Sequence, residues 1–227
     1  MMRILLVTAD DVGLHAGMVR GAIHAHRNGI VTACSIVANG KDFSHAVELL
    51  RDTPSLDAGV HFTLVEEKPL TAPQKVRSLI TNKGRFHSTY TQFSVRYYAG
   101  AIRMEQVERE LRAQIEAILA RKLKVVHANG HQHLHVLPRI WEIVQDLAEE
   151  YGIRYLRVPA DAIPGDAGLQ RTSSIGALNY FGRKARAAAR GRAVVSDRTL
   201  GIAEAGHLTE AKIIRLLDAV EGMAELV

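Results

Sequence analysis

The sequence predicts an α/β protein with a mostly parallel sheet and helical crossovers. Short aliphatic runs without a helical stripe alternate along the chain with segments whose apolar residues recur every three or four positions. The early aliphatic runs end in polar pairs, Asp10-Asp11 and Asn39-Gly40. Strands that alternate with helices in this way form parallel βαβ units. The spacing leaves open whether the sheet is open or closed into a barrel.

The first elements follow this alternation closely. The run RILLVTA, residues 3–9, is typical of a buried strand that ends at Asp10 and Asp11. A helix over 16–28 follows, and the Asn28-Gly29 pair is a helix stop signal. The next expected elements are a strand at 32–38, a helix at 43–51 before Pro54, and a strand at 56–62 that carries His61.

The rest of the chain begins with a less regular segment that contains Pro69, Pro73 and Gly84. We then expect a helix at 104–121, a strand at 124–129, a helix at 139–151 between Pro138 and Gly152, and a strand at 153–158. Beyond Pro159 the pattern weakens. There we expect a Gly/Asp-rich loop, a basic helix over 182–192, a short strand near Val194, and a last helix from Thr209 to about Met223.

Length and composition are typical of one globular domain, which we predict to span 1–227. A chain of 227 residues buries enough apolar surface to fold without disulfide bonds or a structural metal ion. Its 47% hydrophobic and 23% charged residues are ordinary values for a globular protein. No apolar run is long enough to cross a bilayer, and the first residues lack a signal peptide, so we expect a soluble, cytoplasmic protein. The single cysteine, Cys34, excludes an internal disulfide and a cysteine-rich zinc site.

The net charge of +5 is concentrated in one segment, GRKARAAARGR at 182–192. This segment is read either as the solvated face of a helix or as a patch that attracts anionic lipid head groups or phosphorylated ligands. Aromatic residues are few, at 5%, and no nucleic-acid motif is present, so we expect no nucleic-acid partner.

Candidate metal ligands follow three of the predicted strands. They are the pair Asp10-Asp11, His61, and a group of four histidines between 127 and 135. Because the carboxyl ends of parallel strands lie on one face, these side chains should meet there although they are far apart in sequence. Each alone is weak evidence, since paired aspartates also cap helices and turns and a lone histidine is usually structural.

The spacing of His131, His133 and His135 has a geometric consequence. In an extended segment all three imidazoles would face one cavity, whereas in a helix only the first and the last would share a face. Asn129-Gly130 and Pro138 favour a loop. Neutral imidazoles suit zinc and other late divalent metals, and a carboxylate with two histidines can also hold a harder cation.

The motifs TADDVGL, GVHFTLVEEKPL and NGHQHLHVLP resemble those of the YdjC-like carbohydrate deacetylases, in order and spacing from Arg3 to about Pro159. The resemblance implies an irregular, TIM-like α/β barrel of the polysaccharide-deacetylase type. It also implies removal of acetyl from N-acetylglucosamine-type sugars with one divalent metal ion, Mg²⁺ or Zn²⁺, and a homo-oligomer, taken to be a dimer.

The resemblance also assigns roles to individual residues. Asp11, His61 and His131 match the metal ligands of the family, and Asp10 matches its general base. The family motif has Asp and His where this chain has Asn129 and Gln132, and neither change removes an expected ligand. The resemblance places His133, His135 and Asn129 at the border of the site, where they would contact substrate or orient the ligands.

The general acid is missing from this correspondence. The family places it in a His-Pro motif on a strand after the last helix, and this chain stops at EGMAELV, where that strand should begin. We therefore expect either a barrel that is incomplete at its C-terminus or another acid, such as His133. We do not expect His207 to serve, because it lies at the start of the last predicted helix.

The substrate follows from finer resemblances. LVEEKPL, TNKGRF and the helix MEQVERELRAQIEAIL are most similar to the hopanoid-biosynthesis branch, which implies an N-acetylglucosaminyl group on a hopanoid lipid and contact with the inner membrane face. The alternatives are a chito-oligosaccharide or its 6-phosphate as substrate, a metal-dependent phosphoesterase, and a non-catalytic sugar-binding protein.

Overall fold

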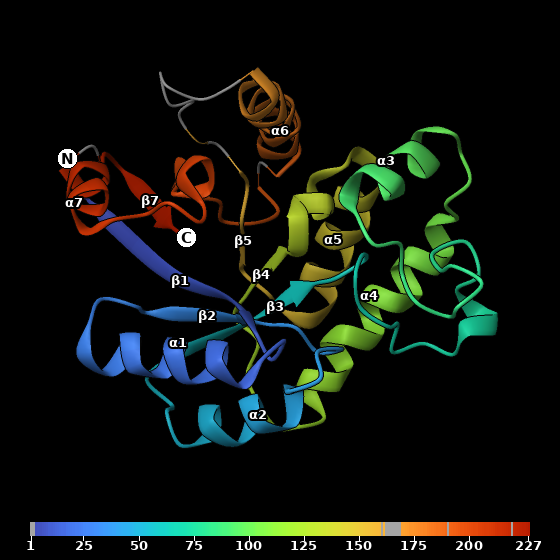
Figure 1. Ribbon diagram of the computed structural model, residues 1–227, viewed down its shortest axis with the longest axis horizontal. Helices are drawn as coiled ribbons and strands as arrows, with labels where there is room; N and C mark the ends of the chain where they lie inside the picture. Colours follow the sequence, from blue (N-terminus) through green and yellow to red (C-terminus); the bar gives the residue numbers. More distant parts are fainter. Residues whose placement is uncertain (1–2, 160, 162–168, 190, 219) are drawn as a thin grey trace.

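The fold is a curled parallel sheet with helices packed on its outer side (Figure 1). The computed structural model describes residues 3–159, 161, 169–189, 191–218 and 220–227. Within these residues seven parallel strands are hydrogen-bonded in the order β5-β4-β3-β2-β1-β7-β6. The strands are β1 (Ile4–Val12), β2 (Ala33–Ile36), β3 (Asp57–Phe62), β4 (His127–Gly130), β5 (Tyr155–Leu156), β6 (Arg198–Leu200) and β7 (Met223–Leu226).

Seven α-helices and three 3₁₀ segments connect these strands in the described part of the chain. The α-helices are α1 (Ala16–Asn28), α2 (Phe43–Arg51), α3 (Tyr90–Tyr98), α4 (Met104–Leu119), α5 (Pro138–Tyr151), α6 (Leu169–Ala188) and α7 (Glu210–Asp218). The 3₁₀ segments are η1 (Pro73–Lys75), η2 (His131–Val136) and η3 (Ile202–Glu204). The helices α1 and α2 lie together below the sheet in Figure 1, and α4 packs beside α5 at its right. None of the described helices is long and apolar enough to span a membrane.

The sheet curls until its two edges approach each other. Tyr155 of β5 forms an isolated parallel bridge with Val194, a few residues before β6 at the other edge. The hydroxyl of Thr199 in β6 donates to the carbonyl of Val158, just after β5, at 2.9 Å. The expected parallel α/β sheet is therefore confirmed, in the form of a curled half-barrel with an irregular seam.

The first strand differs from its prediction because it does not end at the aspartates. It runs to Val12, with a register irregularity between Ala9 and Val12 and a left-handed backbone at Asp11 (φ 60°). The strand resumes pairing because Val12 accepts a hydrogen bond from the amide of Val37 at 2.8 Å. In a regular strand, the side chains of Asp10 and Asp11 would point to opposite sides of the sheet. The bulge instead lets both carboxylates reach His61, Asp10 near its Nδ1 atom and Asp11 near its Nε2 atom.

Four other expected elements also differ from their predictions. The helix α3 forms within the segment expected to be irregular, and its N-cap Thr89 accepts a hydrogen bond from Gln92. Helix α6 begins well before residue 182 and ends at Ala188, and Val194 makes only an isolated bridge. The prediction of a last helix to Met223 was wrong, because α7 ends at Asp218 and Met223 begins β7. The strand β7 forms because Met223–Leu226 pairs with β1 and β6 at once and buries Ala224 and Leu226 in the apolar cluster beside them.

Candidate active site

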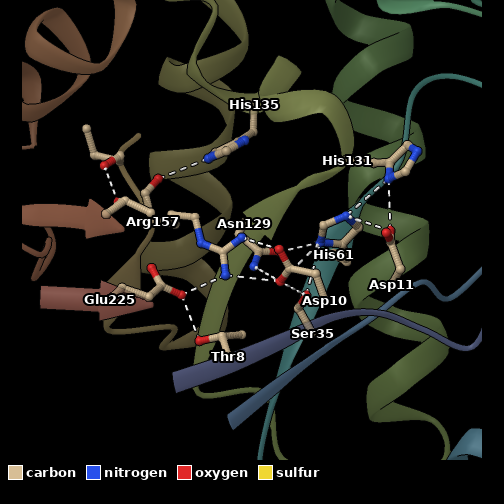
Figure 2. Close-up of polar contacts among 12 residues, drawn as sticks. Thr8, Asp10, Asp11, Ser35, His61, Asn129, His131, His135, Arg157 and Glu225 are labelled. Carbon is tan, nitrogen blue, oxygen red and sulfur yellow. Dashed lines mark hydrogen bonds and ion pairs between the residues drawn. The ribbon is translucent and has the colours of Figure 1, made fainter. Parts of the chain in front are cut away.

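The candidate site lies at the carboxyl ends of the strands, where side chains from five neighbouring strands meet (Figure 2). The strand β1 supplies Asp10 and Asp11, β2 supplies Ser35, β3 supplies His61, β4 supplies Asn129, and β7 supplies Glu225. His131 opens η2 directly after β4, and Arg157 follows β5. This is the convergence that the strand order predicts for a parallel sheet.

Asp11, His61 and His131 form a compact cluster of possible metal ligands. The Oδ1 atom of Asp11 lies 3.2 Å from His61 Nε2 and 2.9 Å from His131 Nδ1. The two imidazole nitrogens are 3.3 Å apart. Ligands about 2.0–2.1 Å from a tetrahedral zinc ion lie roughly 3.3 Å from each other. The donor set, two imidazoles and one carboxylate, therefore fits a divalent cation with an open coordination position.

Asn129 fixes which nitrogen of His61 is free to bind a metal. Its Nδ2 atom donates a hydrogen bond to Asp10 at 2.9 Å, so its Oδ1 atom faces His61 Nδ1 at 2.7 Å and accepts a hydrogen bond from the N–H there. Ser35 donates its hydroxyl proton to Asp10 at 2.7 Å and lies 3.0 Å from the same Nδ1 atom. With the proton held on Nδ1, the lone pair of Nε2 points toward Asp11 and His131.

Glu66 lies beside His131 as Asn129 lies beside His61, but its contact is longer. Its Oε2 atom is 3.4 Å from His131 Nε2, on the opposite side of the ring from the cluster. A proton on Nε2 would leave the Nδ1 lone pair for a metal. Glu66 belongs to the segment LVEEKPL and is 45% exposed, so its carboxylate also faces solvent.

Asp10 points away from the cluster into a buried ion-pair network (Figure 2). Its Oδ1 atom accepts hydrogen bonds from Ser35, Asn129 and Arg157, whose NH2 group is at 3.0 Å. Its Oδ2 atom has only Arg157 as a hydrogen-bond partner within the described residues. Arg157 is completely buried, and its second carboxylate partner is Glu225 at 2.7 Å.

Glu225 completes the network from the last strand. Its Oε1 atom also accepts from Thr8 at 2.8 Å, and its Oε2 atom accepts from the phenol of Tyr155 at 2.6 Å. Both Arg157 and Glu225 have no exposed side-chain surface. A buried guanidinium between two carboxylates is balanced in charge and hydrogen-bonded on most sides, which makes the burial of these charges tolerable.

This network sets the protonation of both aspartates. Burial would raise the pKa of Asp10, but the positive charge of Arg157, followed by His61 and the hydrogen bonds, outweighs it and holds the pKa below its ordinary range. Burial likewise opposes ionisation of Asp11, and its close contacts with the imidazoles of His131 and His61 lower its pKa more strongly. Both carboxyl groups are therefore ionised at neutral pH.

The backbone is strained around the site. Four of the five described non-glycine residues with positive φ lie at or beside it: Asp11, Glu66, Gln132 and His133. Such conformations cost on the order of 1–3 kcal/mol each and persist where the surrounding structure enforces them. Because four such residues gather at the site, the tertiary structure there holds the side chains in place at the expense of a relaxed backbone.

The three alternate histidines do not share one cavity, contrary to the expectation for an extended segment. They lie on η2, a 3₁₀ segment with a left-handed kink at Gln132 and His133. His131 joins the cluster, His133 lines a separate pocket, and His135 is buried with its Nε2 atom 2.9 Å from the carbonyl of Arg157. Burial lowers the pKa of His133 to about 3 and that of His135 to about 4, so both are neutral at pH 7.

The sequence reasoning missed Ser35, Glu66, Arg157 and Glu225. The last two carried a usable signal, because Arg157 interrupts the aliphatic run IRYLRV and Glu225 interrupts MAELV. A charged side chain in a buried strand requires a partner of opposite charge. His207, for which we expected no role, is exposed and lies before α7.

Three bacterial relatives are similar to this chain over most of its length. A carbohydrate deacetylase of Brevibacillus brevis is 39% identical over 66% of this chain and 57% of its own. A chitooligosaccharide deacetylase of Escherichia fergusonii is 36% identical over 74% of this chain and 64% of its own. Carbohydrate deacetylase 1 of Listeria innocua is 36% identical over 67% and 60%, respectively. The match thus spans about three fifths of each relative's length.

The fold and the family are established by two further comparisons. A crystal structure from Enterococcus faecalis V583, of a protein named for cellobiose-phosphate cleavage, superposes with a TM-score of 0.79 at 23% identity and covers 100% of this chain and 80% of that one. At this identity the likeness concerns the fold alone. The family model described as YdjC-like protein matches residues 4–227. With its deacetylase relatives and this match over nearly its whole length, the chain belongs to the YdjC-like family.

Proposed function

We propose that this protein is a metal-dependent N-deacetylase of acetylated amino sugars. The observation that carries the proposal is the arrangement around His61, with a metal-ligand cluster on its Nε2 side and the ionised carboxylate of Asp10 on its Nδ1 side. The names of the relatives, carbohydrate and chitooligosaccharide deacetylases, support the same reaction class.

Asp11, His61 and His131 would hold the metal ion. When bound, a divalent cation lowers the pKa of a coordinated water and polarises the amide carbonyl of the substrate. Two nitrogen donors and one oxygen donor suit Zn²⁺ better than Mg²⁺, which prefers oxygen ligands and keeps several waters. Of the two metals expected from the sequence, we therefore propose zinc.

Asp10 would accept the proton of the attacking water. Arg157 and Ser35 keep its carboxylate ionised and fix its orientation. A quarter of the Asp10 side chain is exposed, and Oδ2, with Arg157 as its one hydrogen-bond partner among the described residues, would be the oxygen that meets the water. A carboxyl group with a lowered pKa holds a proton weakly. The same oxygen can therefore return the proton to the departing amine, which needs one to leave.

The finer proposal for the substrate is an N-acetylglucosaminyl group on a hopanoid lipid, at the inner membrane face. Its support is the resemblance of LVEEKPL and the helix over 104–119 to the hopanoid branch, together with the basic residues Arg183, Lys184 and Arg186 on α6. A basic helix is attracted to anionic head groups. A chito-oligosaccharide or its phosphate is the alternative, which the relative of Escherichia fergusonii favours by its name.

The test is acetate release measured together with metal content. Protein loaded with Zn²⁺ should release acetate from N-acetylglucosaminides and chitobiose, lose this activity with a chelator, and recover it when the metal is restored. It should hydrolyse p-nitrophenyl phosphate at no more than the rate of the chelated protein. Metal-dependent phosphate release without acetate release would refute the deacetylase proposal in favour of a phosphoesterase.

A further inference from the structure

The loop after β3, residues 63–71, runs beside the candidate site and carries Glu66, whose carboxylate contacts the metal-ligand cluster. The loop contains no helix or strand and forms one isolated bridge, between Val65 and His87. Its backbone is left-handed at Glu66, with φ 69°. Such a conformation persists only where the surrounding structure enforces it, so the contacts of this loop decide where Glu66 lies.

Two side chains of α4, Glu110 and Gln114, hold the two ends of this loop. Both are completely buried. The carboxylate oxygens of Glu110 accept hydrogen bonds from the amides of Leu70 and Thr71, each at 2.9 Å. At the other end, the amide of Thr63 donates to Gln114 Oε1 at 2.9 Å, and Gln114 Nε2 donates to the carbonyl of Thr63 at 2.8 Å.

Glu110 and Gln114 are also joined to each other. They lie one turn apart on the same side of α4, and Gln114 Nε2 donates to Glu110 Oε1 at 3.0 Å. Among the described residues, the hydrogen-bond partners of Glu110 are this side-chain amide and the two amides of the loop, none of which carries a positive charge. A buried carboxylate without an opposite charge is costly, and only strong hydrogen bonds offset that cost. The loop is therefore the structural reason for a carboxylate at this buried position.

The middle of the loop is held by the segment over 85–87. The amide of Glu66 donates to the carbonyl of His87 at 2.8 Å, and the guanidinium of Arg85 donates to the carbonyl of Glu66 at 2.8 Å. The Glu66 side chain itself is 45% exposed and reaches His131 Nε2 at 3.4 Å. Because side-chain packing does not fix a half-exposed carboxylate, the backbone of the loop determines whether this carboxylate reaches His131.

We propose that Glu110 and Gln114 are positioning residues, which act through the 63–71 loop to hold Glu66 against His131. The inference rests on the proposed metal-dependent function. With Glu66 in this place, the proton of His131 stays on Nε2, and the lone pair of Nδ1 is available to the ion. Metal binding then depends on a buried carboxylate, that of Glu110, which contacts none of the three ligands.

The test measures the Kd for Zn²⁺, by competition with a chromophoric chelator, in Glu66→Ala, Glu110→Gln and the double variant. Glu66→Ala should weaken binding by about 10–100-fold, the range for loss of an outer hydrogen-bond partner of a ligand. Glu110→Gln keeps the shape of the side chain but replaces one acceptor oxygen with an NH2 group, so one loop amide loses its acceptor. It should weaken binding as well, by no more than Glu66→Ala does. An unchanged Kd in Glu110→Gln would overturn the proposal.

The double variant distinguishes action through Glu66 from a general structural effect. If Glu110 acts through Glu66, Glu110→Gln has no further effect on the Kd once Glu66 is replaced by alanine, so the two fold-changes do not multiply. Fold-changes that multiply would show that Glu110 acts independently and would contradict the proposal. Gln114→Ala releases the opposite end of the loop and enters the same cycle with the same expectation, which keeps the test valid if Glu110→Gln fails to fold.

Gln106→Ala is the matched control on the same helix. Gln106 Oε1 accepts from the amide and the hydroxyl of Ser78 at 2.8 and 2.9 Å, so it holds a segment of backbone in the same way, but Ser78 lies outside the 63–71 loop. The variant should lose stability in urea unfolding and keep the wild-type Kd for Zn²⁺. A loss of affinity equal to that of Glu110→Gln would show that any loosened contact of α4 weakens the site, contrary to the proposal.

Acetate release by the wild-type protein separates this inference from the proposed function. Wild-type protein that binds Zn²⁺ and releases acetate, with the same Kd in the Glu110 and Gln114 variants, would refute the inference alone. Zn²⁺ binding that depends on Glu110 as expected, without acetate release from any N-acetylglucosaminide, would support the inference and refute the deacetylase function. Absence of Zn²⁺ binding to the wild-type protein would refute both.

Discussion

The two ring nitrogens of His61 define two faces of the site, the Nε2 side and the Nδ1 side, and these have opposite surroundings. On its Nε2 side, Asp11 and His131 complete an open cluster, and Glu66 approaches only the far nitrogen of His131. On its Nδ1 face, Asn129, Ser35 and Asp10 continue into the closed network of Arg157 and Glu225. The first face can bind a metal ion, whereas on the second nearly every polar atom already has a hydrogen-bond partner. Because of the bulge in β1, the adjacent residues Asp10 and Asp11 thus lie on different faces.

The substitution with the largest expected effect is His61→Ala, because His61 belongs to both faces. It should lose the ion and turnover together, with metal affinity falling by more than the roughly 10–100-fold that loss of an outer hydrogen-bond partner costs. Metal analysis by mass spectrometry and acetate release measure the two effects. Full metal content in the variant would show that His61 is not a ligand.

Asp10→Asn separates the two faces. The amide cannot accept the water proton, so turnover should fall by about 10²–10⁴-fold while the bound ion remains. Asp52→Asn, at the exposed C-cap of α2, is the matched control and should behave as wild type. Loss of the ion in Asp10→Asn to the same extent as in His61→Ala would overturn the division of roles.

Glu225→Gln tests the closed network. Removing one charge leaves Arg157 with less compensation in a fully buried position, and breaking a buried pair costs about 3–5 kcal/mol of unfolding free energy. The control is Glu150→Gln, which removes the half-exposed partner of Arg112 and should cost no more than about 1 kcal/mol. Urea unfolding measures both, and equal losses would show that the Glu225 charge is not required.

Asn129→Ala acts on the link between the faces. Without the amide oxygen, the proton of His61 is no longer held on Nδ1 by Asn129, and metal affinity should fall by about 10–100-fold. A metal titration followed by calorimetry measures this change. Unchanged affinity would mean that Ser35 alone fixes the orientation of His61.

The smallest effect is the pH dependence of stability due to buried His127. Burial lowers the pKa of His127 to about 4 from its usual 6.5, so between these values the unfolded chain binds a proton that the folded chain does not. Stability should therefore fall as the pH drops from about 6.5 to 4, by on the order of 1 kcal/mol between pH 7 and 6. Unfolding curves of His127→Phe should have a shallower slope over this range, and an unchanged slope would contradict the assignment.

The sequence predicts most of the first 158 residues well, for a physical reason. There strands such as β1 lie in an aliphatic run, and helices such as α4 and α5 bury an apolar stripe, so local periodicity and tertiary burial agree. In the C-terminal part, β6 has three residues and β7 has four, and both form through pairing with distant strands. Length alone does not explain the difference, because β2, β4 and β5 are as short; those strands lie in the longer apolar segments 30–38, 123–130 and 153–158, whereas β6 and β7 have no such run around them.

The sequence by itself determined which chemical groups are present and which strand ends bring them together. The positions after predicted strands bring the pair Asp10-Asp11, His61 and the histidine group together, because parallel strands direct their carboxyl ends to the same face, and the family resemblance selects Asp11, His61 and His131 among them. Only the tertiary structure decided what surrounds them. The bulge at Asp11 depends on backbone strain, and the tautomer held by Asn129 and the Arg157–Glu225 pair depend on contacts between residues 68 positions apart; no local pattern encodes these.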